Sequence, residues 1–279
     1  MKVFIGLLSL LVITRTVVAQ YYYKDIILTK QISERCKIYK ENAVKAVRLS
    51  SFEGTGEPTE GFVCEQTVTN NFSEISTYTH SNSSSASSLT TFYDTKGLLK
   101  KTIDTSDTYQ STTDYAYDST GHIISITNTS LETDNQVKDE EQHIWKYNQN
   151  GKPSGMLKIK NGTDTTYIQF LEDEKGNVSE ERAMRHKTNL PAIYYYYNNE
   201  NRLTDIVRYN AKAQRLLPDY IFEYDNKGRI VSMLFVPAGS SDYQKWIYEY
   251  NERGLKWKES CFNKRKILLG RIEYQYSFQ

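Results

Sequence analysis

The sequence has few aliphatic residues and no excess of charge of either sign. Only 38% of its 279 residues are apolar, even with tyrosine counted, and the mean hydropathy is −0.64. Soluble proteins average about 45–50% apolar residues, so neither a thick globular core nor a bundle of apolar helices is expected. With 35 Lys and Arg against 34 Asp and Glu, net electrostatics exclude a binder of nucleic acid or of a charged membrane surface.

The motifs of the common enzyme classes are also missing. The sequence has no H-E-x-x-H, G-x-S-x-G, G-x-G-x-x-G or P-loop pattern, and its four histidines have no ligand spacing. We therefore expect no catalytic residue, no metal site and no cofactor. Acidic clusters at Glu140/Glu141, Glu172/Asp173/Glu174 and Glu180/Glu181 are the nearest approach to the carboxylate pair of a glycoside hydrolase. Each cluster lies beside Lys, Gln or Asn, which predicts solvated surface.

Long apolar runs are absent except at the start of the chain. Residues 1–19 combine an early lysine, an apolar run from Val3 to Ile13 and small residues up to Ala19, a pattern typical of a signal peptide cut before Gln20. The run is shorter than the ~20 residues that span a bilayer, and no comparable run follows it. We expect no membrane span and an exported protein, located in the periplasm, at the cell surface or outside the cell.

Cysteine is scarce. Cys36, Cys64 and Cys261 are an odd number in a chain expected in an oxidising compartment, so at most one disulfide fits within a monomer. The sequence does not choose among the three pairings. No C-x-x-C spacing indicates metal or redox chemistry.

A short pattern recurs eight times from residue 52 onward, and a repeat of this kind determines a fold. Successive copies start 24 to 30 residues apart after a first interval of 41, which suits a β-hairpin and its connection. Asp or Asn in second place opens a turn, and Gly or Asn in fifth place tolerates positive φ, so a type I turn closed by a left-handed residue is expected. The turn residues are Asp94, Gly97, Asp118, Gly121, Asn148, Gly151, Asp173, Gly176, Asn198, Asn201, Asp225, Gly228, Asn251 and Gly254.

Aromatic residues alternate with other residues before each turn, and an aliphatic, β-branched run follows it. Period two places alternate side chains on one face of a strand, so each repeat is expected to be a hairpin. The 23 Tyr, 10 Phe and 3 Trp would then form a thin core by cross-strand stacking, with many tyrosines half-buried. A second hypothesis makes the rings a platform for a ligand. Its candidate residues are Tyr115, Trp145, Tyr195, Tyr197, Phe222, Tyr224, Trp246 and Tyr248.

The connections between hairpins vary in length and are all expected at the edge opposite the turns. The longest is predicted from Asn128 to Gln142. Variable loops gathered on one edge of a repeat array often form a binding face, although tolerance of insertions explains them too. The serine-rich segment Ser81–Ser88 predicts a polar loop.

The segments YAYDSTGHIISI at 115–126, IFEYDNKGRIVSM at 221–233 and YEYNERGLKW at 248–257 resemble the YD repeats of the Rhs family. The resemblance covers about residues 47–279. It implies a long spiralling antiparallel sheet, which in the large members closes into a shell around a toxic C-terminal domain. This chain is too short for a full shell and has only 25 residues after Gly254. It is similar instead to the small exported YD-repeat proteins of Gram-negative bacteria, especially the Bacteroidetes.

Residues 20–46 precede the repeats. The spacing of their apolar residues predicts an amphipathic helix from about Lys24 to Asn42 that covers the first edge of the sheet. The stretch from Tyr21 to Leu28 fits an edge strand equally well.

The sequence therefore predicts an all-β fold, with about eight hairpins in one twisted, curved antiparallel sheet. Four four-stranded blades of a propeller are the alternative arrangement. We expect an exported, non-catalytic binding or scaffold protein, which holds a glycan or a protein partner on its aromatic face or its connecting loops. The alternatives are a carbohydrate-active enzyme, which would need two carboxylates that converge in a cleft, and a purely structural shell fragment. The oligomeric state stays open.

Overall fold

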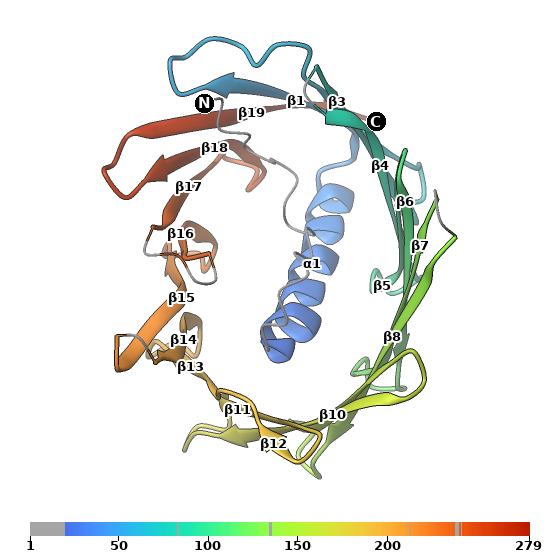
Figure 1. The fold of residues 1–279 in the computed structure, drawn as a ribbon. Helices are drawn as coiled ribbons and strands as arrows, with labels where there is room; N and C mark the ends of the chain where they lie inside the picture. Colours follow the sequence, from blue (N-terminus) through green and yellow to red (C-terminus); the bar gives the residue numbers. More distant parts are fainter. Residues whose placement is uncertain (1–19, 83, 134–135, 212, 238–239, 241) are drawn as a thin grey trace. The chain divides into compact units, whose positions relative to one another are not determined.

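The computed structural model describes residues 20–82, 84–133, 136–211, 213–237, 240 and 242–279, so the predicted signal peptide lies outside the described residues. One helical segment comes first, as the π-helix η1 (Tyr22–Ile27) that continues into the α-helix α1 (Leu28–Glu41). Strands follow it, so the fold is all-β with one short N-terminal helix (Figure 1). This confirms the predicted fold class.

Nineteen strands are found in the described part of the chain. They are β1 (Val44–Glu53), β2 (Val63–Val68), β3 (Glu74–Ser81), β4 (Ser84–Tyr93), β5 (Leu99–Ser106), β6 (Tyr109–Tyr117), β7 (Ile123–Glu132), β8 (Lys138–Tyr147), β9 (Pro153–Lys160), β10 (Asp164–Glu172), β11 (Val178–Arg185), β12 (Thr188–Asn189), β13 (Ile193–Tyr197), β14 (Leu203–Asn210), β15 (Arg215–Tyr224), β16 (Ile230–Phe235), β17 (Gln244–Tyr250), β18 (Lys256–Asn263) and β19 (Leu268–Phe278).

The described residues form two compact units. The helix unit comprises Gln20–Leu49, Glu60–Ala192 and Gln275–Gln279. The C-terminal unit comprises Ser50–Thr59 and Ile193–Tyr274. The two ends of β1 fall in different units, and so do the two ends of β19.

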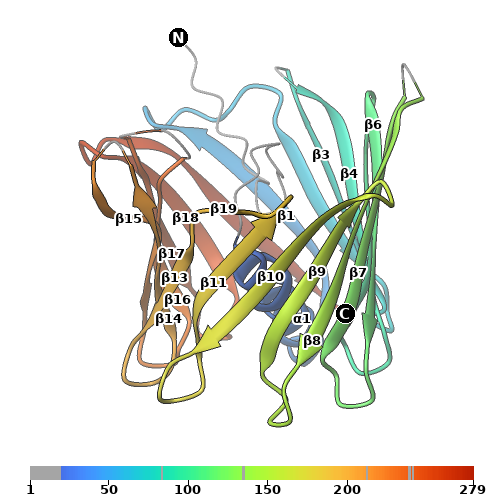
Figure 2. The ribbon, with the colours of Figure 1, turned by 60° about the horizontal axis from the view of Figure 1, so that its bottom comes forward.

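In the helix unit, every strand from β2 to β11 pairs antiparallel with the next strand of the chain. Figure 2 shows β7 to β10 side by side in this order. Consecutive antiparallel pairing is the predicted array of hairpins. A continuous ladder of this length excludes four-stranded propeller blades.

The first edge of the sheet differs from the prediction. β1 pairs with β2 and also with β19, so the first and last strands are neighbours. The helix therefore covers no free edge at β1. The prediction of a simple twisted, curved sheet is wrong in this respect, because a repeat pattern specifies which strands are consecutive and not what its two ends do.

The hairpins share one irregularity, a shift of register at the residue that begins the turn motif. The shift falls between Ala116 and Tyr117 in the β6/β7 hairpin and between Glu223 and Tyr224 in the β15/β16 hairpin. Equivalent shifts occur in five other hairpins. A bulge bends its strand and redirects the side chain at that point, which gives each motif aromatic residue the same local setting.

Two predicted loops are strands instead. β7 and β8 run through most of the connection predicted from Asn128 to Gln142, and only the residues between Glu132 and Lys138 lie outside them. β3 and β4 likewise run through most of Ser81–Ser88. The predictions are wrong because Ser, Thr and Asn side chains in these strands hydrogen-bond one another across the ladder.

The core of the helix unit lies on one face of its sheet. Four buried residues in a cross-strand row are Trp145, Met156, Ile168 and Ala183. Helix α1 buries Ile32, Cys36 and Tyr39, which have the predicted helical spacing. The Leu99 N–H of β5 donates to Ser33 Oγ of α1 at 3.1 Å, so the helix packs on this sheet.

All three cysteines, Cys36, Cys64 and Cys261, are buried and free. None of the disulfide pairings that the sequence left open is formed. Burial raises the pKa of the Cys36 thiol to about 11 and that of Cys261 to about 12, so both stay protonated at neutral pH and behave as small apolar side chains.

Candidate functional site

The repeat turns hold their acidic and amide side chains against their own backbone. Asp94 Oδ1 accepts the N–H groups of Lys96 and Leu98, both at 2.8 Å. Gly97 has φ of +80°, and its N–H donates to the Asp94 carbonyl at 3.0 Å. The same acceptor pattern recurs at Asp118, Asn148, Asp173, Asn198, Asp225 and Asn251. The residues at positive φ in these turns are Gly121, Gly151, Gly176, Asn201, Gly228 and Gly254.

The tyrosine that begins a motif links its turn to the preceding one. Four tyrosine hydroxyls each donate to a carbonyl of the strand that follows the previous turn: Tyr117 to Leu99 at 2.6 Å, Tyr147 to Ile123 at 2.8 Å, Tyr224 to Leu203 at 2.6 Å and Tyr250 to Ile230 at 2.9 Å. Burial raises the pKa of Tyr224 and Tyr250 to about 12, so both hydroxyls keep the proton that they donate.

The residue after a turn glycine or asparagine covers the ring of the next motif tyrosine. His122 stacks on Tyr147 at 4.8 Å between centroids, and the Arg229 guanidinium lies 4.5 Å from the ring centre of Tyr250. The hydroxyl bond and this cover give the motif tyrosine a structural role that was not predicted from the sequence. The available signal was the recurrence of Tyr, rather than Phe, directly before the turn acid.

The predicted ligand-facing aromatic residues divide into two groups. Trp145, Tyr195, Phe222 and Trp246 are buried. Tyr115, Tyr197, Tyr224 and Tyr248 are half-buried. Trp145 stacks on Phe170 with the ring centroids 5.0 Å apart, which is a core contact. The most exposed aromatic residues are others, among them Tyr167 at 59% and Tyr209 at 52%.

A cluster of charged side chains joins the helical segment to the sheet in the helix unit. His143 Nδ1 of β8 lies 2.7 Å from Asp25 Oδ2 of η1, and His143 Nε2 lies 3.0 Å from Glu141 Oε1. Trp145 Nε1 donates to the same Asp25 oxygen at 3.1 Å, and Lys158 Nζ of β9 lies 2.7 Å from Glu141 Oε2. We call these five residues the histidine cluster. The prediction of solvated surface at Glu141 is wrong, because its carboxylate takes part in this cluster.

The histidine cluster holds a cation rather than a general base. Burial disfavours the imidazolium, but the carboxylates of Asp25 and Glu141 outweigh that effect and raise the pKa of His143 to about 9. Burial likewise disfavours the Glu141 carboxylate, but His143 and Lys158 lower its pKa well below the ordinary value. A protonated imidazole with a carboxylate at each nitrogen has no lone pair to accept a proton. The carboxylates of Asp25 and Glu141 do converge here. They converge on the imidazolium of His143, whose side chain is only 12% exposed, and not in an open cleft.

The prediction for Glu181 of β11 is also wrong. Glu181 was expected on solvated surface, yet its side chain is fully buried. Its carboxylate accepts the backbone N–H groups of Gln20, Tyr21 and Tyr22 at 2.8, 3.2 and 3.1 Å. The alternation of β11 places Glu181 on the same face as buried Ala183, whereas its partners lie far away in the sequence.

The other face of β8 to β11 carries an exposed apolar row. Tyr167 lies opposite Leu157 on one side and Met184 on the other, and Leu157 lies opposite Ile144. Tyr167 is 59% exposed and Met184 41% exposed, while Ile144 and Leu157 are half-buried. Polar residues Gln169 and Arg182, themselves a cross-strand pair, flank it. We call Ile144, Leu157, Tyr167 and Met184 the apolar row.

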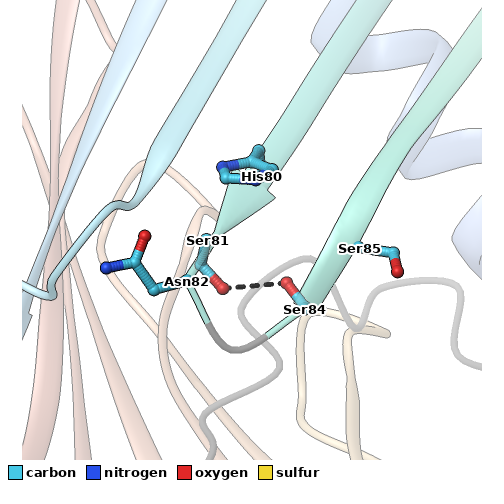
Figure 3. Close-up of a pocket in the computed structure, with 5 residues that line it drawn as sticks. All are labelled: His80, Ser81, Asn82, Ser84 and Ser85. Carbon is cyan, nitrogen blue, oxygen red and sulfur yellow. Dashed lines mark hydrogen bonds between the residues drawn. The ribbon is translucent and has the colours of Figure 1, made fainter.

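Shallow hollows lie on both units of the described chain. The first, at the β3/β4 hairpin, is lined by polar side chains only, and Ser81 Oγ lies 2.8 Å from Ser84 Oγ (Figure 3). The second lies on β18 and β19 in the C-terminal unit and combines rings with charges. Its lining residues are Trp257, Lys258, Ser260, Phe262, Leu268, Arg271 and Glu273.

Among the described residues, no group of three or more His, Cys, Asp or Glu side chains is arranged to hold a metal ion. No described helix is long and apolar enough to cross a membrane.

The fold and these sites define a class of protein, an all-β repeat protein of consecutive hairpins with tyrosine-linked turns. No model of a known protein family matches the chain, and no curated protein matches it. Among solved structures, a porin-like protein from Bacteroides uniformis is similar with 9% identity and a TM-score of 0.40, over 84% of this chain and 98% of that one. A porin-like protein from Bacteroides vulgatus has 12% identity and a TM-score of 0.29, over 85% and 98%. The Tc holotoxin pore of Photorhabdus luminescens has 10% identity and a TM-score of 0.31, over 77% of this chain and 16% of that one. At these scores the likenesses carry no argument about function.

Proposed function

We propose that this protein is an exported, non-catalytic binding protein of the YD-repeat kind, which holds a protein partner on the apolar row of its helix unit. The exposure of Tyr167 and Met184 as direct cross-strand neighbours is the observation that carries the proposal. Apolar side chains on adjacent strands form one contiguous surface, and such patches with a polar rim mark interaction sites.

A protein partner suits the apolar row better than a glycan does. Three of its four members are Ile144, Leu157 and Met184, whose aliphatic or thioether side chains pack on other apolar side chains. A sugar would need rings for stacking and several hydrogen-bonding groups around them. The row offers one ring, Tyr167, and the flanking pair Gln169 and Arg182.

The YD-repeat part of the proposal is supported by the motif turns and by the tyrosine hydroxyl bonds between them. Export rests on the pattern of residues 1–19, and the periplasm, the cell surface and the medium are the compartments proposed. Catalysis is no part of the proposal, because the carboxylates that converge do so on protonated His143.

Cross-linking of the exported protein in its native cells tests the proposal. We expect the double variant Tyr167→Ser, Met184→Ser to lose the cross-linked partner that the unaltered protein retains. The matched control is Tyr78→Ser on β3 of the same unit, because Tyr78 is 48% exposed and lies outside the row. The proposal would be contradicted if the double variant and the control retained the cross-linked partner equally. If no partner were cross-linked to any of the three proteins, the purely structural role of a shell fragment would be favoured instead.

A glycan is the second candidate ligand, and the hollow on β18 and β19 favours it. Trp257 is 41% exposed, and Lys258 Nζ lies 5.3 Å from its ring centre. A ring beside charged groups can stack on a sugar and hydrogen-bond its hydroxyls. On a glycan array, Trp257→Ala should abolish binding that Tyr209→Ala, an exposed ring of the same unit outside the hollow, leaves intact. The half-buried Tyr115, Tyr197, Tyr224 and Tyr248 stay candidates in the same assay.

A further inference from the structure

Glu181 is a buried carboxylate that faces the start of the described chain. It is fully buried on β11, and its Oε1 lies 2.8 Å from the Gln20 nitrogen. A carboxylate taken out of water loses its hydration, which hydrogen bonds and nearby positive charge must offset. Burial lowers the pKa of Lys24 and the charge of Glu181 opposes that shift, so one cation already acts on this carboxylate. A cation at the Gln20 nitrogen, 2.8 Å from Oε1, would add a direct contact.

The backbone of Gln20 supplies a second, independent observation. Gln20 has φ of +116° and is only 3% exposed. A residue with a Cβ rarely occupies this region, because the preceding carbonyl crowds the side chain. The angle φ exists only when a peptide bond joins residue 19 to the Gln20 nitrogen. A chain that begins at Gln20 has no such carbonyl and no such strain.

Both observations lead to one inference, which rests on the export part of the proposed function. We propose that Glu181 is the receptor for the α-ammonium group that forms at Gln20 when the leader is cut after Ala19. Hydrolysis of that peptide bond consumes one water molecule, leaves a carboxylate on Ala19 and leaves the amine, which takes up a proton, on Gln20. The hydrogen bond from an uncharged N–H to the Glu181 carboxylate then becomes an ion pair at the same position.

The burial of the Gln20 nitrogen sets the order of events. A peptidase must reach the bond before Gln20, and it cannot do so while Gln20 is buried against Glu181. Cutting therefore precedes docking, and the charge that the cut creates strengthens docking. Gln20 also accepts the Lys24 N–H at 2.9 Å, so the docked residue is the start of the helical segment that carries Asp25. Processing thus promotes the attachment of η1 to the sheet.

The ion pair also protects the terminal residue chemically. A terminal glutamine cyclises when its own neutral amine attacks the side-chain amide carbon, forms the ring amide and expels ammonia. Only the unprotonated amine attacks. Glu181 holds the proton on the amine, and each unit by which it raises the amine pKa lowers the reactive fraction about tenfold.

The contribution of the ion pair to stability is tested with two chains. One begins at Gln20, and the other has a single alanine before Gln20, so that the Gln20 amine becomes a peptide amide. We expect the extended chain to unfold at lower denaturant concentration. In a Glu181→Gln background the two chains should unfold at the same concentration, whereas in Glu180→Gln they should differ as in the unaltered protein. Glu180 is the matched control, because it pairs with Arg182 on the other face of β11. An equal effect of the alanine in all three backgrounds would overturn the proposal.

Mass spectrometry of ammonia loss provides a readout that a merely structural role would not move. In the chain that begins at Gln20, Glu181→Gln should speed cyclisation about tenfold or more relative to Glu180→Gln. Should Glu181→Gln fail to fold, the unaltered protein still decides, because its cyclisation should speed up when denaturant releases Gln20. Equal rates folded and unfolded would overturn the proposal.

These tests separate the proposal from the proposed function. N-terminal sequencing of the exported chain that finds another first residue would overturn the Glu181 proposal and leave partner binding untouched. If the unaltered protein binds no partner, but the added alanine destabilises it only when Glu181 is present, the proposed function alone would be overturned.

Discussion

The two units of the molecule neutralise their buried charges in different ways. In the helix unit, Asp25 and His143 are 118 residues apart, and Gln20 and Glu181 are 161 apart. In the C-terminal unit, Arg208 binds Asp219 across 11 residues, and Lys256 binds Glu259 across three. The helix unit therefore depends on one short segment that docks from far away in sequence, whereas these pairs of the C-terminal unit form within neighbouring strands.

The difference teaches where each unit is vulnerable. The loss of a local pair leaves a side chain that can turn to water, because Arg208 is 25% exposed. The loss of Asp25 leaves an imidazolium in a setting where His143 is only 12% exposed. The turns, by contrast, are built alike in both units, so changes there should cost the same in each.

The largest expected effect comes from Asp25→Ala. It removes the acceptor shared by His143 and Trp145, and breaking a buried ion pair costs about 3–5 kcal/mol. The corresponding change in the other unit, Asp219→Ala, should cost about 1–3 kcal/mol, because Arg208 regains water. Urea unfolding followed by tryptophan fluorescence measures both, with Asp114→Ala as a control for an exposed ion pair, expected at about 0–1 kcal/mol. Equal losses at Asp25 and Asp219 would remove the distinction between the units.

The pH dependence of stability should show the same asymmetry. The pKa of His143 rises from 6.5 to about 9 on folding, because Asp25 and Glu141 outweigh the effect of burial. Protonated His143 therefore stabilises the fold fully below pH 6.5. This contribution, roughly 3 kcal/mol, is lost as the pH rises through 9. The groups that face the imidazole are Asp25, Glu141 and the Tyr21 ring, with Lys158 on Glu141.

The control for this dependence is His143→Gln. The difference in unfolding free energy between the unaltered protein and this variant should shrink between pH 6.5 and pH 9, since other titrating groups are common to both. A difference that stays constant over that range would mean that His143 is not held as a cation.

The sequence predicted the hairpins, the turn residues and the all-β class because these depend on local chemistry. Asp94 and Gly97 act within five residues of each other, so their types alone specify the turn. The sequence placed Glu141 and Glu181 wrongly because their partners, Asp25 and Gln20, come from a segment whose docking position no local pattern encodes. The polar neighbours of these acids then pointed to solvent. The pairing of β1 with β19 was missed for the same reason.

Replacing one turn glycine in each unit tests whether equivalent turns contribute equally to stability. Gly97 of the helix unit has φ of +80°, with no atom within 4 Å of an added Cβ, and Gly254 of the C-terminal unit has φ of +76°, with one side-chain atom at 3.9 Å. Alanine at either position should therefore cost only the left-handed strain, about 1–2 kcal/mol. Asn201→Gly, at φ of +57°, is the control that leaves the turn unstrained. Unequal losses at Gly97 and Gly254 would show that the turns differ in more than φ.

The smallest effect is expected from the tyrosine hydroxyls that link successive turns. Tyr117→Phe in the helix unit and Tyr224→Phe in the C-terminal unit each remove a donor to a carbonyl at 2.6 Å. Each loss should cost about 1 kcal/mol, and the two should agree because the geometry is the same. Tyr209→Phe, on a ring 52% exposed, should change the urea midpoint little. If Tyr117→Phe and Tyr224→Phe also leave the midpoint unchanged, the motif needs tyrosine for its ring alone, which in Tyr224 lies 5.8 Å from the Arg202 guanidinium of the preceding turn.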